Sequence, residues 1–178
     1  SARRKLLMTR LRGILERFVA SPPHADELHL ASSVQWRTSA PDEGGAASTS
    51  PMLEVEALWA CCESATLFKD QEAGQWGLEL LSRDESERWT QRMKQDLPQD
   101  YRSSDVVVGA FLGDGDLLVV APSEVGVRRV LVALEMEHRA EWVGVGAELV
   151  SFLEAYLARQ GDKFWDVAQS RVRTVRDS

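Results

Sequence analysis

The sequence predicts an α+β fold, a single domain in which helices flank a central, mostly antiparallel sheet. Three β-rich runs follow one another at 105–112, 117–121 and 130–134, and a Gly-Asp-Gly-Asp segment separates the first two. Gly and Asp tolerate the positive φ of tight hairpin turns, so the first two runs are predicted to pair. Over residues 147–160 the spacing of the apolar residues changes to the period of an α-helix. One face of this helix gathers Leu149, Val150, Leu153, Tyr156 and Leu157.

The length and composition suit one compact domain. The chain has 178 residues, of which 44% are hydrophobic, and six of them are Trp. Folding should bury roughly 70% of the unfolded surface, and no run approaches the ~20 apolar residues of a membrane span. The basic Arg3-Arg4-Lys5 is followed by an apolar stretch that Thr9-Arg10 interrupts, so we expect no signal peptide and a cytoplasmic protein.

Three parts are expected along the chain. Residues 1–51 should hold a helix, an edge strand and a flexible loop; residues 52–166 should form the α+β core; residues 167–178 should be a basic tail.

The amino-terminal part begins with a basic amphipathic helix at 4–20, which Pro22-Pro23 ends. A membrane-surface or partner helix would have this pattern, but we favour a helix packed on the domain with its arginines in solvent. Imperfect alternation at 28–36 indicates an edge strand, and 37–51 should be a mobile loop. The packed face of the helix is expected to comprise Leu7, Leu11, Ile14, Leu15 and Phe18.

Within the core, residues 52–63 are predicted to form a helix and 66–69 and 76–81 two short strands joined by a turn. Ser82 and Glu85 have the spacing of a capping box, which would start a charged helix that runs to about Gln95. Further on, Phe164-Trp165 should dock on the domain. Trp59 and Trp76 are expected in the core or at its rim.

Charge is distributed unevenly. The net charge is −7, yet 1–17 and 170–178 together hold nine basic residues against two acidic ones, which leaves about −14 in between. An acidic body disfavours nucleic acid and favours a basic partner, whose encounter rate it raises. Solubility alone would also explain an acidic surface.

The sequence contains few residue patterns that support catalysis or metal binding. His24, His29 and His138 stand apart, and no zinc, nucleophile-elbow or phosphate-loop motif occurs. The adjacent Cys61 and Cys62 are expected to be reduced and to pack as small hydrophobic residues. We therefore expect no enzyme, no metal and no cofactor. The close pair Asp114 and Asp116 lacks the further ligands of a calcium loop and is expected to serve a turn; reversal of both charges is expected to leave folding nearly intact.

Short motifs in a fixed order carry a family resemblance. They are Leu58-Trp59, Thr66-Leu67-Phe68-Lys69-Asp70, Gly74-Gln75-Trp76-Gly77-Leu78, Phe111-Leu112-Gly113-Asp114-Gly115-Asp116-Leu117-Leu118, and a closing helix with Phe152-Leu153, Gly161 and Phe164-Trp165. Over roughly Leu53 to Asp166 the chain resembles the SUKH superfamily, bacterial immunity proteins related to fungal cell-wall-assembly regulators.

The resemblance implies an α+β fold and a protein that binds a cognate toxin, often a nuclease, and so neutralises it. A regulatory or scaffolding protein of the fungal type is the alternative; an enzyme with dispersed catalytic residues is the third. The chain departs from the family pattern at Glu63-Ser64-Ala65, where Gly-Gly or Asn-Gly is frequent, and its Leu97-Pro98 lies too late to match the family's Leu-Pro turn.

A basic toxin domain would meet acidic side chains, which we assign by charge and expected exposure rather than by any family motif. Glu135 and Glu137, two apart, are expected on one side of a strand. The candidates for partner binding are Asp70, Glu72, Asp114, Asp116, Glu135 and Glu137. Neither nucleic acid nor membrane is expected as a partner.

Overall fold

The computed structural model describes residues 1–21, 29–38 and 50–166. Most of the loop expected at 37–51 and all of the tail expected at 167–178 lie outside the described residues. The elements, in chain order, are α1 (Ala2–Ala20), β1 (Leu30–Trp36), α2 (Ser50–Cys61), β2 (Cys62–Asp70), β3 (Leu78–Leu80), α3 (Arg83–Asp96), β4 (Val106–Phe111), β5 (Leu117–Val120), η1 (Gly126–Arg129), β6 (Val130–Ala133), η2 (Arg139–Glu141), β7 (Val143–Gly146) and α4 (Leu149–Ala158).

The described strands form one seven-stranded sheet in which spatial order follows chain order, β1 to β7, and every neighbouring pair is antiparallel. The predicted α+β class with an antiparallel sheet and flanking helices is therefore confirmed. Such a meander reverses direction at each step, so alternate connections lie at the same edge of the sheet. The β2–β3, β4–β5 and β6–β7 connections share one edge, and this arrangement positions the candidate site.

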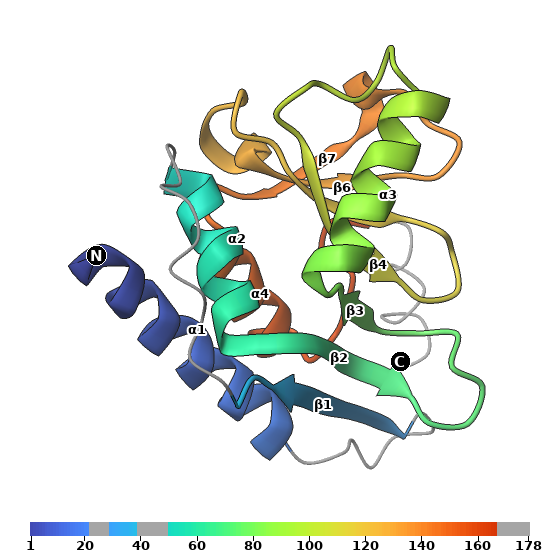
Figure 1. Ribbon diagram of the computed structural model, residues 1–178. Coiled ribbons are helices and arrows are strands. Elements are labelled where there is room, and N and C mark those ends of the chain that lie inside the picture. The colour runs from blue at the N-terminus through green and yellow to red at the C-terminus, as the bar shows by residue number, and fades with distance from the viewer. Residues whose placement is uncertain (22–28, 39–49, 167–178) are drawn as a thin grey trace.

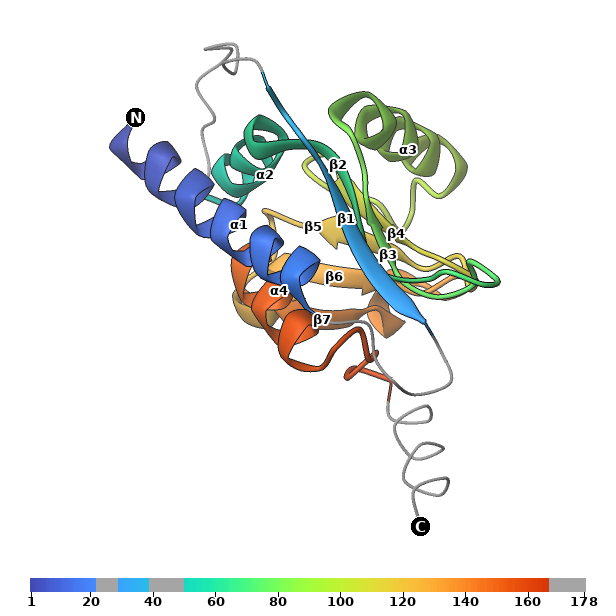
Figure 2. The ribbon, with the colours of Figure 1, turned by 90° about the horizontal axis from the view of Figure 1, so that it is seen from below.

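Helices cover both faces of the sheet unequally. Figure 2 shows α1, α2 and α4 together on one side of the strands and α3 on the other. The larger apolar cluster lies beneath the three helices and includes Phe18, Phe68, Phe152 and Tyr156. The smaller cluster lies on the face of α3, where Tyr101 and Trp142 meet edge to face with ring centroids 4.9 Å apart.

The amphipathic patterns that predicted the two long packed helices are confirmed. All five residues of the expected apolar face of α1 are buried, as are the five expected for α4, and Phe152 joins them. Burial of these stripes against the sheet stabilises the helices, since most helical stability in proteins comes from packing of an amphipathic face rather than from intrinsic propensity. The capping box also forms, because the Ser82 hydroxyl accepts from Glu85 N and the Glu85 carboxylate accepts from Ser82 N.

The bounds of a predicted helix and of two predicted strands differ from the expectation. The helix expected to end at Glu63 ends at Cys61, and β2 starts directly at Cys62, without an intervening turn. Both cysteines are buried and free, and burial raises the thiol pKa of Cys62 to about 12, so it stays protonated. The strand expected at 76–81 is confined to β3, Leu78–Leu80.

Candidate functional site: an acidic edge of the sheet

The shared edge of the β2–β3, β4–β5 and β6–β7 connections brings together most of the predicted partner-binding residues (Figures 1 and 2). A Cβ built on Gly113 would collide with the carbonyl oxygen of Gln75, so the first two turns are in direct contact. The third connection joins them through Glu135 N, which donates to Asp116 Oδ1 at 2.9 Å. We call the five candidates Glu72, Asp114, Asp116, Glu135 and Glu137 the acidic edge.

The β4–β5 turn is built by its own aspartates. Asp116 N donates to Asp114 Oδ1 at 3.0 Å, and Gly113 and Gly115 adopt φ of 98° and 79°, which other residues adopt only with strain. The predicted turn role of this pair is confirmed. Burial raises the pKa of Asp116, and the nearby Glu135 and Asp166 charges add to that effect, whereas the hydrogen bond from Glu135 N opposes it.

Lys163 is the residue of this region that the sequence did not reveal. It is 7% exposed, forms an ion pair with Asp114, and places its ammonium 4.9 Å from the Trp76 ring centroid and 5.7 Å from that of Phe111. Burial lowers the pKa of Lys163. The lysine thereby neutralises Asp114 and connects the segment that follows α4 to the turns. In the sequence, the two aromatic residues that follow Lys163 indicate that this segment packs on the domain, but they do not indicate the ion pair.

Asp70 is a correction to the predicted set. We expected it to be exposed, but it is 5% exposed and its Oδ1 accepts from Glu72 N at 2.9 Å. Its own backbone N–H donates to the Trp76 carbonyl at 3.0 Å, which closes the β2–β3 connection. Asp70 therefore shapes the turn, and it is Glu72 that reaches solvent there.

Glu135 and Glu137 are exposed, as expected, but not for the expected reason. β6 ends at Ala133, so neither lies on a strand; both lie in the connection to β7, where Glu137 N donates to the Leu134 carbonyl at 3.2 Å. Between them Met136 adopts a left-handed φ of 68° and is 96% exposed. They flank a projecting turn, because the backbone reverses at Met136.

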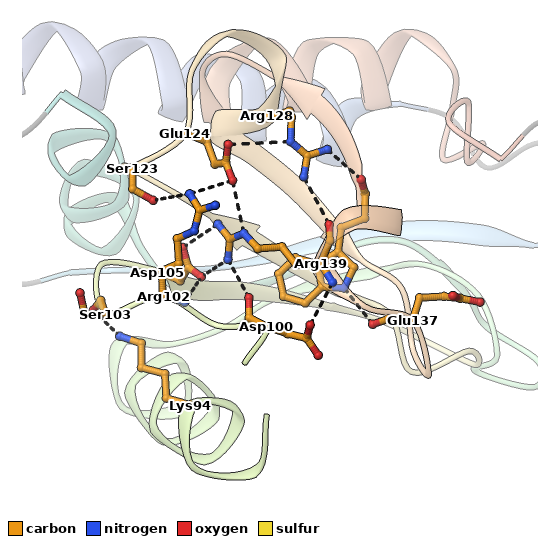
Figure 3. Close-up of polar contacts among 11 residues, drawn as sticks. Lys94, Asp100, Arg102, Ser103, Asp105, Ser123, Glu124, Arg128, Glu137 and Arg139 are labelled. Atoms are coloured by element: carbon orange, nitrogen blue, oxygen red, sulfur yellow. Dashed lines mark hydrogen bonds and ion pairs between the residues drawn. The ribbon is translucent and has the colours of Figure 1, made fainter. Parts of the chain in front are cut away.

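A second polar cluster holds the other end of β4 (Figure 3). The buried guanidinium of Arg139 forms a two-pronged ion pair with Asp105, donates to the Asp100 carbonyl at 2.9 Å and reaches Glu124 at 3.3 Å. Asp105 is fully buried. Every member is matched to a partner, so the cluster fastens the 134–142 connection to the sheet rather than offering a reactive group.

Glu54 is a buried carboxylic acid of α2 whose pKa is strongly raised. It is 4% exposed and accepts a hydrogen bond from Leu149 N at the start of α4. Burial raises its pKa to about 7, and the neighbouring Glu148 contributes in the same direction. The hydrogen bond from Leu149 N acts in the opposite direction and lowers the pKa, because it stabilises the ionised carboxylate; Leu149 N is one of the donors that a helix start leaves unpaired.

Two of the hollows on the described surface lie away from the acidic edge. The larger, about 630 Å³, lies between α2, α3 and the segment before β4; the smaller, about 210 Å³, adjoins Glu54. Within the described ranges no three His, Cys, Asp or Glu side chains are placed to hold a metal ion. Of the three histidines of the chain, His29 and His138 lie within the described residues and His24 lies outside them.

Comparison of the chain with protein-family models, with curated proteins and with solved structures found no match. In the part of the chain that the structure describes, no helix is both long and apolar enough to cross a membrane. The fold and the site thus define an α+β domain with an acidic turn edge.

Proposed function

We propose that this protein is a non-enzymatic, protein-binding module of the SUKH type, an immunity or antitoxin-like protein that binds and neutralises a cognate bacterial toxin in the cytoplasm. The observation that carries the proposal is the acidic edge. Two connections that are separate in sequence, β2–β3 and β6–β7, bring the exposed Glu72, Glu135 and Glu137 to one edge of the sheet.

A basic partner fits this surface. Charges of one sign on neighbouring turns attract a protein of opposite sign over a distance of about one Debye length, roughly 8 Å at physiological salt, and so raise the association rate. Nuclease toxins are commonly basic where they contact nucleic acid, and an acidic protein can occupy that site. The resemblance to the SUKH superfamily supports the same class of partner.

The proposal is tested by affinity capture from the native host with mass-spectrometric identification. Wild-type protein is compared with a variant in which the three exposed acids of the edge are reversed. A control variant reverses three exposed acids on other elements of the structure. The edge variant is Glu72→Lys, Glu135→Lys, Glu137→Lys, and the control is Glu63→Lys, Glu87→Lys, Glu154→Lys.

We expect wild type and control to retain a basic protein that the edge variant does not retain. Production of the retained protein alone should arrest growth, and co-production of wild type should restore it. A retained protein without toxicity would instead favour the regulatory or scaffolding alternative. Equal retention by all three baits would show that the acidic edge is not the binding surface.

A further inference from the structure

The 630 Å³ hollow is lined by α2 and α3, two helices that cover opposite faces of the sheet, and by the segment that leads into β4. Its volume lies within the range of pockets that hold small molecules, about 300–1,000 Å³. Apolar surface predominates in the lining, and the side chains that supply it are Met52, Trp59, Val106 and Pro122. Contact with an apolar molecule would therefore be favourable here. We call this site the Trp59 hollow.

Trp59 brings an unmatched hydrogen-bond donor to the hollow. The residue is 7% exposed, and its indole Nε1–H is buried without an acceptor among the described residues. A buried N–H of this kind is unfavourable, because it has lost its hydrogen bond to water and gained none in return. The exposed Arg83 lies over the same ring, with its guanidinium carbon 4.9 Å from the ring centroid. The indole N–H is thus a polar group that an incoming acceptor would satisfy.

Other polar groups of the lining already have partners. The Ser86 hydroxyl donates to the Val107 carbonyl, and the Thr90 hydroxyl accepts from Val107 N at 2.9 Å. The carboxylate of Asp105 is paired with the buried Arg139. The bonds from Ser86 and Thr90 hold α3 against β4, so this wall of the hollow is preformed.

The remaining charged side chains of the lining balance one another. Two of them are basic, Arg83 and Lys94, and two are acidic, Glu56 and Glu87. Lys94 also donates to the Ser103 carbonyl at 2.6 Å, which joins α3 to the segment before β4 (Figure 3). Equal numbers of both signs give little net attraction for an anion or a cation, whereas an uncharged molecule needs none.

The Trp59 hollow is remote from the acidic edge. β2 begins at Cys62, directly after α2, and β4 begins at Val106, so the hollow adjoins the starts of these two strands. The acidic edge lies at their other ends. Figure 2 shows α2 and α3 on the two sides of these strands, with the β2–β3 connection away from them at the right. A molecule in the hollow would leave the acidic edge uncovered.

We propose that the Trp59 hollow binds a small, uncharged and largely apolar molecule that carries a hydrogen-bond acceptor. The apolar body of the molecule contacts Met52, Val106 and Pro122, and its acceptor receives the Trp59 Nε1–H. Because this N–H is enclosed in the structure, a neighbouring side chain moves as the molecule enters. Arg83 is suited to that movement, since it is exposed and makes no ion pair with another described residue.

Titration of the purified full chain with Nile red tests the proposal. This dye is uncharged and apolar, carries a carbonyl acceptor, and fluoresces more strongly in apolar surroundings. Binding should saturate at one dye per chain, with a Kd of roughly 1–100 µM. Anilinonaphthalene sulfonate, an aromatic anion, should bind more weakly. Tighter binding of the sulfonate would overturn the assignment of an uncharged ligand.

Trp59→Phe keeps an aromatic ring and removes the N–H, so it should weaken Nile red binding by about 3- to 10-fold. The control is Trp89→Phe, because Trp89 also lies under an arginine, with Arg92 at 5.6 Å, but is not part of the hollow. It should bind the dye as wild type does. Equal binding by the two variants, or no saturable binding by wild type, overturns the proposal.

Nuclear magnetic resonance reads the hydrogen bond itself. The chain has six Trp, and the indole N–H signal that is missing in Trp59→Phe is that of Trp59. Nile red should move this signal downfield and leave that of Trp89 in place. A Trp59 signal that does not move at saturating dye contradicts the proposed contact.

A second pair of variants decides the question should Trp59→Phe not fold. Gln91 is exposed and lines the hollow, whereas Gln95 is exposed on the same helix outside it. Gln91→Phe places a ring in the hollow and should reduce dye binding, and Gln95→Phe should not. Equal affinity of these two proteins for Nile red would show that the dye binds elsewhere and would overturn the proposal.

Discussion

At the scale of single residues, the buried cations Arg139 and Lys163 are each surrounded by groups that stabilise their charge. Arg139 has two carboxylates and a carbonyl around it, and Lys163 has a carboxylate and two aromatic rings. Glu54 differs, because its principal partner is a backbone N–H and its neighbour Glu148 is another acid. A paired ion and an unpaired one respond in opposite ways to mutation and to pH.

Substitution of Arg139 by Ala should lower the free energy of unfolding by about 3–5 kcal/mol, because it leaves the fully buried Asp105 carboxylate without its partner. The matched control is Arg92→Ala, which removes an exposed ion pair with Asp96 and should change stability by less than about 1 kcal/mol. Urea unfolding of wild type, Arg139→Ala and Arg92→Ala measures both changes in the free energy of unfolding. Equal effects of the two substitutions would contradict the structural role of the buried cluster.

Glu54→Gln should make the protein less sensitive to pH. The folded-state pKa of Glu54 lies near 7 and above the ordinary value of 4.5, so its stabilising contribution is full below pH 4.5 and is lost as pH rises to about 7. Above that range the variant should be more stable than wild type by roughly 2–3 kcal/mol. Below pH 4.5 the two should match.

Thermal unfolding across pH 4–8 checks this prediction. Glu56→Gln, at a partly exposed position of the same helix, serves as the control. A pH dependence that is the same in Glu54→Gln and in wild type would mean that Glu54 is ionised in the folded protein at neutral pH.

At the scale of elements, the ends of the helices decide how they meet the sheet. α4 ends before Gly161, whose φ is 85° and whose built Cβ would lie 2.7 Å from the Phe68 Cβ. This contact shows that β2 and the end of α4 approach each other closely, at a point where Phe68 itself adopts a left-handed φ of 50°. This contact places the following Lys163 against the turns of the acidic edge.

Two glycines should therefore respond in opposite directions to replacement by Ala. Gly161→Ala should destabilise the protein by more than about 2 kcal/mol, through strain at positive φ and the clash with Phe68. Gly13→Ala, inside α1 with nothing within 4 Å of the added Cβ, should stabilise it by about 0.5–1 kcal/mol. Denaturant midpoints of the two variants measure the contrast; a stabilised Gly161→Ala protein would refute the close approach.

At the scale of the whole molecule, charge is separated along the sheet. Arginines of α1 and η1 lie around one end of β6 and β7, and the acidic edge lies at the other. A molecule of this kind meets partners in a preferred orientation, because its two ends attract opposite charges. The roles of the acids at the edge are not equal, however. Asp114 and Asp116 hold the turns, whereas Glu72, Glu135 and Glu137 reach solvent.

Charge reversal should separate these roles. Asp114→Lys with Asp116→Lys removes the partner of buried Lys163 and the acceptor of Glu135 N. The free energy of unfolding should therefore fall by about 2–4 kcal/mol. The sequence alone led to the opposite expectation, that folding stays nearly intact. Glu72→Lys with Glu135→Lys should change it by less than about 1 kcal/mol, as exposed substitutions usually do. Calorimetry of both variants measures the difference, and equal stability would show that the Lys163 contact contributes little.

The sequence by itself determined the fold class, the amphipathic helices, the capping box and the central hairpin, because these depend on patterns within one short segment. It also selected acidic residues that the sheet assembles. Only the tertiary structure decided that Asp70 is buried, that Glu135 and Glu137 flank a projecting Met136, and that Lys163 neutralises Asp114. Those features depend on which turns share an edge and which distant residues meet there. No local pattern encodes that information, since the same turn residues serve a hairpin wherever it is placed in a sheet.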